Sequence, residues 1–209
     1  MTSHAQTIPL QASPDPRVAE ILERIKGVFA AKGFDGASMQ DLARAAGMSA
    51  GNFYRYFPSK GAIIEAMVLS DLAEVESDFA RIMQHPSPRD ALRATIWRRM
   101  TEEIAEEGPL WAEIEAAAAR RPEIAAIHAT INRAIRAYLL RVFARLAGVP
   151  EDEGAVRFAT HADLLVLLVR GAAMEACGQA VGNPPANAAA LNRAVMRHVD
   201  LILAEIAGE

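Results

Sequence analysis

The stretch MQDLARAAGMSAGNFYRYF, residues 39–57, is the most informative part of the sequence. Counted from its first residue, Ala43 is fifth, Gly47 ninth and Phe53 fifteenth. A helix-turn-helix requires a small side chain where the second helix crosses the first, a turn residue that tolerates positive φ, and an apolar anchor beneath the second helix. The spacing therefore predicts two short helices joined by a tight turn.

Capping signals set the helix ends around this stretch. Ser38 and Asp41 have the spacing of a capping box, which starts the first short helix. Ser49 has the side chain of an N-cap for the second helix. Apolar residues at three- and four-residue spacing predict a long helix over residues 59–84, which ends before a Pro-Ser-Pro break. We expect this long helix to connect two parts of the chain.

Helical periodicity extends over the rest of the sequence, and the alternation typical of strands is hard to find. Asp15 and Pro16 begin a helix that runs to Gly33. Pro and Gly residues then separate five further helices, over residues 88–107, 109–120, 122–147, 151–181 and 187–207. The sequence therefore predicts an all-α protein with a disordered tail at 1–14, a helix-turn-helix domain at 15–58 and a second domain at 59–209.

Composition excludes several classes of protein. A single cysteine, Cys177, excludes an internal disulfide, and the Cys and His spacing fits no zinc site. The longest uninterrupted apolar run, Leu164–Val169, is too short to cross a membrane, and the N-terminus lacks the pattern of an export signal. Residues 1–70 carry seven Lys and Arg against six Asp and Glu, which is a weak basic footprint. We expect a cytoplasmic protein with no membrane contact, metal or other cofactor.

The second short helix carries residues that do not favour helix stability. Glycine costs up to about 1 kcal/mol relative to alanine within a helix, and asparagine is also a poor helix former, yet Gly51 and Asn52 lie in the first turn. A residue without a side chain lets a helix N-terminus approach another molecule closely, and the helix dipole there favours anions. Tyr54, Tyr56 and Lys60 add two hydroxyls and an ammonium, which are donors suited to phosphate. The alternative is that both tyrosines are ordinary surface or core aromatics.

Residues 18–68 resemble the DNA-binding domain of TetR-family transcriptional repressors. The resemblance rests on four segments, FAAKGF (29–34), SMQDLA (38–43), AGMS (46–49) and GNFYRYFPSK (51–60). It implies a three-helix DNA-binding domain on a six-helix domain that binds a ligand and dimerises, and it implies that ligand binding releases the operator.

The resemblance also implies roles for individual residues. Tyr54, Tyr56 and Lys60 match positions that hold phosphates, although many relatives have histidine at the position of Tyr56. Gln40, Ala50, Gly51 and Asn52 match positions that reach bases, and Ala50 stands where relatives often have a longer polar side chain. Gln40 and Asn52 are therefore the main candidates for base readout through their amides. The DNA-binding residues expected from the sequence are Ser38, Gln40, Ser49, Ala50, Gly51, Asn52, Tyr54, Tyr56 and Lys60.

A partner chain is expected because one recognition helix supplies few contacts to DNA. We expect a homodimer that binds a palindromic operator in double-stranded DNA, with half-sites about one helical turn or a multiple apart. Helices 151–181 and 187–207 are predicted to form the interface, because apolar residues and a glycine recur along them at helical spacing: Leu164, Leu167, Leu168, Gly171, Leu191, Val195, Val199 and Ile202.

The second domain is expected to bind a small, mostly apolar effector that lowers operator affinity. Large apolar side chains and a few polar groups on helices 88–181 are the candidate ligand contacts: Trp97, Met100, Trp111, Tyr138, Phe143, His161, Arg170, Met174 and Glu175. Each has an alternative, because aromatic and methionine residues at helical spacing often belong to a core, and polar groups often face solvent or an interface. The long helix 59–84 is the expected lever between effector and DNA.

Two other functions compete with an effector-controlled repressor. A small all-helical enzyme is disfavoured, because the sequence has no Glu-x-x-His pair, no His-Glu-x-x-His and no glycine-rich phosphate loop. No catalytic residue is therefore predicted. A DNA-binding protein without an effector is the other alternative, and a roomy, partly polar cavity in the second domain would argue against it.

Overall fold

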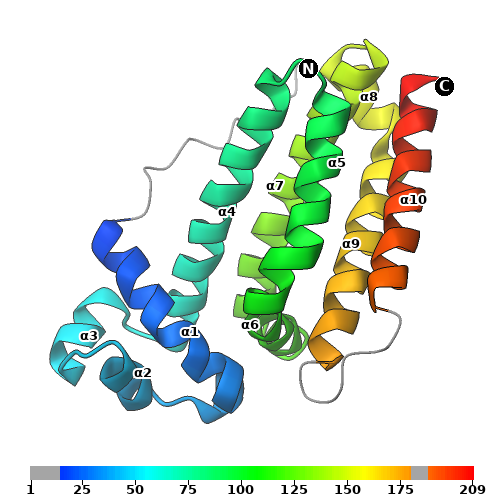
Figure 1. The fold of residues 1–209 in the computed structure, drawn as a ribbon. Helices are drawn as coiled ribbons and strands as arrows, with labels where there is room; N and C mark the ends of the chain where they lie inside the picture. Colours follow the sequence, from blue (N-terminus) through cyan, green and yellow to red (C-terminus); the bar gives the residue numbers. More distant parts are fainter. Residues whose placement is uncertain (1–14, 180–187) are drawn as a thin grey trace.

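The computed structural model describes residues 15–179 and 188–209, and within these ranges the chain is helical and contains no strand. Ten α-helices and one π-helical segment follow one another within the described residues (Figure 1). This confirms the all-α class. The predicted tail at 1–14, the end of the predicted helix 151–181 and the side chain of Cys177 lie outside what is described.

Three helices form an N-terminal head, which we define as residues 15–58. They are α1 (Pro16–Gly36), α2 (Met39–Ala45) and α3 (Ala50–Tyr56). The chain then continues as α4 (Lys60–Gln84), which begins beside the head and runs away from it along the other helices (Figure 1). The long connecting helix expected from the sequence is therefore present with nearly the expected bounds.

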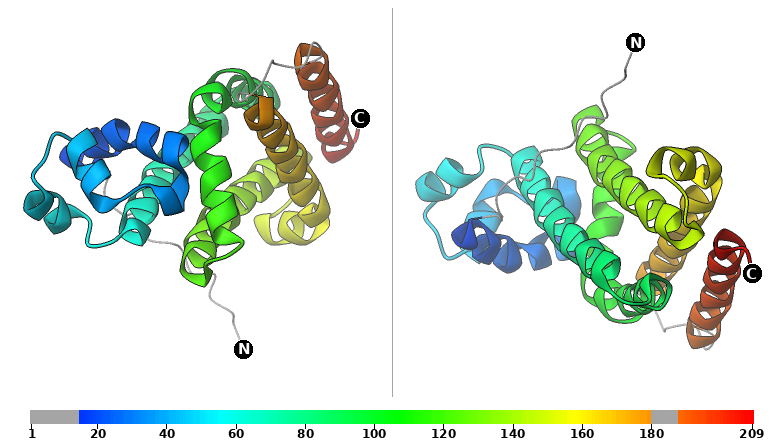
Figure 2. Two further views of the ribbon diagram at one scale, coloured as in Figure 1. Left: turned by 90° about the horizontal axis from the view of Figure 1, so that it is seen from below. Right: turned by 90° about the horizontal axis from the view of Figure 1, so that it is seen from above.

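The remaining helices form the body, which we define as the described residues from 59 onward. They are α5 (Pro88–Arg98), α6 (Ile104–Ala118), α7 (Pro122–Ala147), α8 (Glu151–Arg157), α9 (Ala159–Gln179) and α10 (Ala188–Ala207). Figure 1 shows α6 end-on beneath α5 and α7, and Figure 2 shows it lengthwise next to the head. Helices α9 and α10 lie side by side at the edge farthest from the head (Figure 2).

Two predicted helix boundaries are wrong. The predicted break at Gly108–Pro109 lies inside α6, and the chain instead changes direction at the π-helical segment Arg99–Glu103. A π-helical turn widens the helix locally and commonly accompanies a kink. Sequence punctuation by glycine and proline does not reveal such a turn, because no particular residue type marks it.

The predicted single helix over 151–181 is divided into α8 and α9 at Phe158. Phe158 is buried in the core of the body, where its ring lies edge-on to Phe143. Gly154 packs so closely on α7 that an added Cβ would lie 2.6 Å from the Cβ of Ala144. These two tertiary contacts set the angle of α8, and neither leaves a signal in the local sequence.

The head shares its hydrophobic core with helices of the body. Its buried residues form one cluster with residues of α4, α6 and the start of α7, including Leu110, Ile114 and Ile124. A second cluster fills the body and joins α5, α7, α9 and α10. Because α6 and α7 contribute to the head's core, a displacement of these helices acts directly on the packing of the head.

None of the helices within the described residues combines the length and hydropathy of a membrane span.

Candidate nucleic-acid interface and cavity

The turn between α2 and α3 has the geometry that the sequence predicts. Ala43 is 3% exposed, and Phe53 is completely buried beneath α3. Gly47 has a φ of 67°, a left-handed conformation that glycine adopts without strain. All three predictions for this motif are confirmed, and α3 is thereby held on the surface of the head.

Both serines predicted to bind DNA also cap the short helices. Ser38 Oγ accepts a hydrogen bond from the Asp41 backbone N–H at 3.1 Å, and the Ser38 N–H donates to Asp41 Oδ2 at 3.2 Å. Ser49 Oγ accepts from the Asn52 N–H at 3.3 Å. The Ser38 hydroxyl, followed by Lys32, lowers the pKa of Asp41 to about 2. The two helix starts are therefore fixed before any DNA contact is made.

The outward face of α3 lies opposite Phe53. On a helix with 3.6 residues per turn, the positions two before and two after Phe53 project directly away from the core. These positions are Gly51 and Arg55, with Asn52 and Tyr54 on either side of them. Every residue of the predicted interface except Lys60 is exposed, on α2, on α3 or at the caps of these helices: Ser38, Gln40, Ser49, Ala50, Gly51, Asn52, Tyr54 and Tyr56.

Sequence reasoning overlooked Arg55. Its side chain is exposed at the centre of the outward face, and it takes part in no ion pair among residues 15–179 and 188–209. Arg44 on α2 is 78% exposed and lies 3.6 Å from Asp41. The signal was present, because Arg55 stands two residues after the buried anchor and therefore points outward on any helix.

Lys60 has a different set of partners from the phosphate expected. Its Nζ donates to the carbonyl oxygens of Phe34 at 2.7 Å, Ala37 at 3.1 Å and Asp35 at 3.3 Å. An ammonium has three N–H donors, so these three carbonyls use all of them. Lys60 therefore caps the carboxyl end of α1 and ties the start of α4 to the head.

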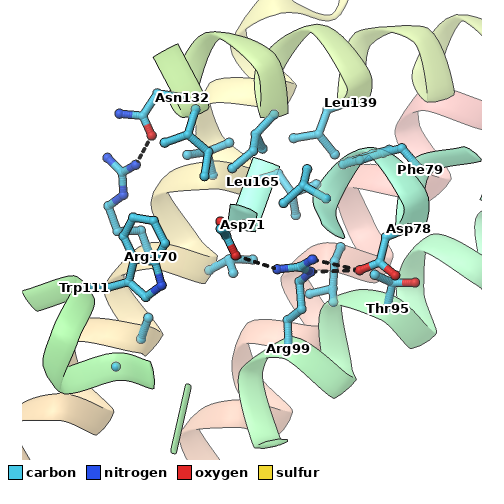
Figure 3. A pocket seen from close by; sticks show the side chains of 18 of the residues that line it. Asp71, Asp78, Phe79, Thr95, Arg99, Trp111, Asn132, Leu139, Leu165 and Arg170 are labelled. Carbon is cyan, nitrogen blue, oxygen red and sulfur yellow. Dashed lines mark hydrogen bonds and ion pairs between the residues drawn. The ribbon is translucent and has the colours of Figure 1, made fainter. Parts of the chain in front are cut away.

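A cavity of about 260 Å³ lies in the body between α4, α5, α6, α7 and α9. Its wall is mostly apolar, with Phe79, Ile96, Leu139 and Leu165 among its lining residues, and polar groups gather at two places (Figure 3). Small-molecule sites have this composition, an apolar wall with a few polar groups. No group of three or more His, Cys, Asp or Glu within the described ranges is arranged to hold a metal ion.

The first polar place centres on Asp78, which is buried. Its carboxylate accepts from Arg98 at 2.9 Å and from Arg99 at 2.8 Å, and it also pairs with Arg81. Arg99 lies between Asp78 and Asp71 at the wall of the cavity (Figure 3). Three guanidinium groups compensate the burial of this one carboxylate.

The second polar place is a ring of four neighbouring side chains from three helices. Arg170 Nε lies 3.1 Å from Glu115 Oε1, and an Arg170 terminal nitrogen donates to Asn132 Oδ1. The Asn132 amide nitrogen lies 3.4 Å from His128 Nδ1, and His128 Nε2 lies 3.7 Å from Glu115 Oε1. Burial and the neighbouring Arg170 lower the pKa of His128, which keeps the imidazole neutral at neutral pH. All four residues line the cavity.

The structure brings three of the nine predicted ligand contacts to the cavity wall: Trp111, Arg170 and Met174. The other six lie elsewhere. Met100 and Phe143 are core residues, Trp97 and Glu175 are exposed, Tyr138 stacks on Phe79 outside the lining, and His161 lies 3.5 Å from Glu205 of α10. Helical spacing identifies the buried face of a helix but not which neighbours fill the space beyond it, so the sequence alone does not show which of the nine residues line the cavity.

Polar lining residues that sequence reasoning missed had a detectable signal. Asp71 and Asp78 occupy two positions of an otherwise apolar stripe along α4 that continues through Val68, Val75 and Ile82. A charged group at such a position requires a partner or a ligand. The same reasoning applies to His128, which follows Ile124 by one helical turn on α7.

Helix α6 connects the cavity to the head. The Phe34 backbone N–H donates to Glu113 Oε2 at 3.1 Å, and this contact lies directly after Gly33, whose φ of 70° interrupts α1. Asp35 pairs with Arg121, at the start of α7, at 2.5 Å. Glu113 and Glu115 are two residues apart and therefore about 200° apart around the helix. One contacts the head and the other lines the cavity.

Comparison with known proteins agrees with this arrangement of a helix-turn-helix head on a helical body. The sequence profile of "Bacterial regulatory proteins, tetR family" matches residues 21–67. The HTH-type transcriptional regulator UidR of Escherichia coli is 29% identical over 127 residues, which are 59% of this chain and 64% of UidR. EthR of Mycobacterium tuberculosis, another HTH-type transcriptional regulator, is 34% identical over 86 residues, 41% of this chain and 39% of EthR. The chain thus aligns with less than two thirds of the length of these relatives.

Solved structures extend the likeness to the body. GusR of Salmonella enterica aligns with 92% of this chain and 97% of its own, at 25% identity and a TM-score of 0.69. NalD, the secondary repressor of the MexAB-OprM multidrug efflux pump in Pseudomonas aeruginosa, aligns with 87% of this chain and 95% of its own, at 20% identity and a TM-score of 0.61. The chain belongs to the TetR family of transcriptional regulators.

Proposed function

We propose that this protein is a homodimeric transcriptional repressor that binds a palindromic operator through α2 and α3 and releases it when a small, mostly apolar molecule enters the cavity. The observation that carries the proposal is the exposed outward face of α3 on a head whose core is shared with cavity-lining helices. The residues proposed to contact DNA on α2 and α3 are exposed, so burial in the core does not explain them.

The chemistry of each side chain indicates whether it contacts bases or phosphates. The amides of Gln40 and Asn52 suit the donor and acceptor edge of adenine in the major groove. Tyr54, Tyr56 and the exposed Arg55 suit phosphate oxygens. Lys60 acts as a positioning residue in this proposal, because its three donors hold the end of α1.

Two exposed helix faces support a dimer. Leu164, Leu167 and Gly171 lie exposed along one face of α9, and Leu201 is 66% exposed on α10. Val195, Val199 and Ile202, which we expected at the interface, are buried within the chain instead. The dimer is therefore proposed to form through the outward face of α9 with the exposed side of α10.

The cavity favours an effector-controlled repressor over a DNA-binding protein without an effector. Its apolar wall and two polar places offer a ligand both burial and orientation. An effector can shift the equilibrium only if it binds one head arrangement better than the other. Helix α6 is the proposed route, together with α4, since Glu113 holds the head while Glu115 faces the cavity.

Selection of bound fragments from bacterial genomic DNA, followed by binding measurements on the recovered operator, tests the proposal. Gln40→Ala and Asn52→Ala should relax preference at particular base pairs by about 1–3 kcal/mol. Arg55→Ala should weaken all sequences alike and reduce the slope of log K against log salt by about one for each phosphate that it no longer neutralises. Arg133→Ala, which removes the same charge from an exposed site on α7, is the matched control. Recovery of no preferred sequence would refute the proposal.

A further inference from the structure

The ring formed by Glu115, Arg170, Asn132 and His128 gives the cavity a polar site that a purely apolar pocket would lack. Its members come from α6, α7 and α9 and meet at the wall of an otherwise apolar cavity. The hydrogen-bonding directions follow from the Arg170 donor, and the 3.7 Å between His128 Nε2 and Glu115 Oε1 is a contact too long for a hydrogen bond. Asn132 Oδ1 accepts from Arg170, so its amide nitrogen donates to His128 Nδ1, and the His128 proton lies on Nε2 toward Glu115.

The ring is balanced in charge. Glu115 and Arg170 are paired at 3.1 Å, and both are more than half buried. His128 is kept neutral by burial, which lowers its pKa. The other polar place is balanced as well, because Asp78 has three guanidinium partners and Asp71 lies 4.0 Å from Arg99. Each charged side chain among the described lining residues therefore has a partner of opposite charge.

Spare hydrogen-bonding capacity remains in the ring. A guanidinium has five N–H donors, and the contacts with Glu115 and Asn132 use only part of them. Glu115 meets both Arg170 and His128 through Oε1, so Oε2 can still accept. A ligand group that accepts from Arg170 and donates to Glu115 adds to the ring without breaking it.

An ionised ligand is at a disadvantage in this site. A carboxylate that takes Arg170 leaves Glu115 without its cation, and an ammonium that takes Glu115 leaves Arg170 without its anion. Separating the members of this partly buried ion pair costs free energy, because the remaining charge loses its partner where solvent only partly replaces it. An uncharged head group avoids this cost.

We infer that the effector is an uncharged molecule with an apolar body and a head group that both donates and accepts hydrogen bonds, such as a primary carboxamide or an alcohol, bound at the Glu115–Arg170 pair. This inference rests on the proposed function, since it names the class of molecule that occupies the same cavity. The apolar body lies along the wall formed by Phe79, Leu139 and Leu165.

A matched series of probes tests the inference. 4-Phenylbutanamide, 4-phenylbutyrate and 4-phenylbutylamine share one apolar body and differ in the head group, which is uncharged, anionic or cationic. Octanamide, octanoate and octylamine repeat the comparison on a straight chain. Binding is followed by calorimetry and by fluorescence of Trp111, which lines the cavity, in a Trp97→Phe background. The expected result is that each amide binds about tenfold or more tightly than its carboxylate and its amine.

Two substitutions should change which of the three head groups binds most tightly. Glu115→Gln leaves Arg170 without its anion, so the carboxylate should become the best probe of each series. Arg170→Gln leaves Glu115 without its cation, so the amine should become the best probe. Glu153→Gln and Arg157→Gln, which neutralise the members of an exposed pair at 3.9 Å on α8, are the matched controls and should keep the wild-type order.

The outcomes are separable from those of the proposed function. Operator binding without any probe is measured for every variant, and its presence or absence bears only on the DNA-binding proposal. Equal affinity for the three head groups, tighter binding of an ion to the wild type, or no binding of any amide would each overturn the inference. An unchanged order of preference in Glu115→Gln and Arg170→Gln would overturn the assignment of the head group to this pair.

Discussion

Substituting Gly33 by alanine tests the link between head and body. Gly33 has a φ of 70° and a ψ of 170°, a region that is essentially restricted to glycine and costs other residues about 1–3 kcal/mol. The added Cβ would also lie 2.9 Å from Glu113 Oε2, so that carboxylate must move away from the Phe34 N–H. A hydrogen bond to a charged group contributes about 1.5–3 kcal/mol, less where it is partly exposed.

The expected net cost of Gly33→Ala is about 2–4 kcal/mol, after allowance for the loss of chain entropy in the unfolded state. Gly27→Ala is the matched control in the same helix. Gly27 is exposed, and no atom lies within 4 Å of the position that an added Cβ would take. Alanine there should therefore stabilise α1 by about 0.5–1 kcal/mol.

Urea unfolding followed by circular dichroism, at one fixed protein concentration, measures the change in the free energy of unfolding for Gly33→Ala and for Gly27→Ala. A double-mutant cycle with Glu113→Ala separates the backbone contribution from the steric one. Gly33→Ala should cost less in the Glu113→Ala background, since the displaced carboxylate is absent. If Gly33→Ala is as stable as Gly27→Ala, or if the two substitutions at positions 33 and 113 are additive, the proposed contact between α1 and α6 is wrong.

Three further predictions concern the head and the cavity wall. The Asp41 pKa of about 2 lies below the ordinary value of 3.8, so ionised Asp41 stabilises the fold above about pH 4 and this contribution is lost as the pH falls through 2. Ser38→Ala should raise the Asp41 pKa in an NMR titration and make the free energy of unfolding fall less as the pH is lowered. Asp78→Asn should cost about 1–3 kcal/mol in urea unfolding, because it removes the buried charged acceptor that Arg98 and Arg99 share, and an unchanged midpoint would contradict this. Lys60→Met should lower stability and operator affinity but leave the salt slope of DNA binding unchanged; a slope reduced by about one per protomer would instead assign Lys60 to phosphate.

The helix-turn-helix was predictable because its determinants are local. Gly47, the Ser38 cap and the buried Phe53 each act within a few residues of their own position, so their spacing alone specifies the motif. The same holds for the start of α4 at Ser59, whose Oγ accepts from the Ala62 N–H at 3.1 Å.

The features that the sequence did not reveal are determined by residues far apart in the chain. The break at Phe158 depends on the close approach of Gly154 to Ala144 on another helix, and the π-helical turn after Arg98 has no sequence signature. The role of Lys60 depends on the carbonyl groups of α1, which lie more than twenty residues earlier in the chain. A single sequence contains no record of these contacts.

Coupling between ligand and DNA depends on which helices join the two sites. The sequence suggested α4 as the lever, and α4 does line the cavity and begin beside the head. Helix α6, however, contributes Leu110 and Ile114 to the head's core and Glu113 to the end of α1, while Glu115 on its other side belongs to the ring. Because packed interfaces do not deform continuously, a ligand that draws Glu115 into new hydrogen bonds must either leave α6 in place or move its opposite face against the head. The difference in ligand affinity between those two positions sets the largest change in operator affinity that any effector can produce.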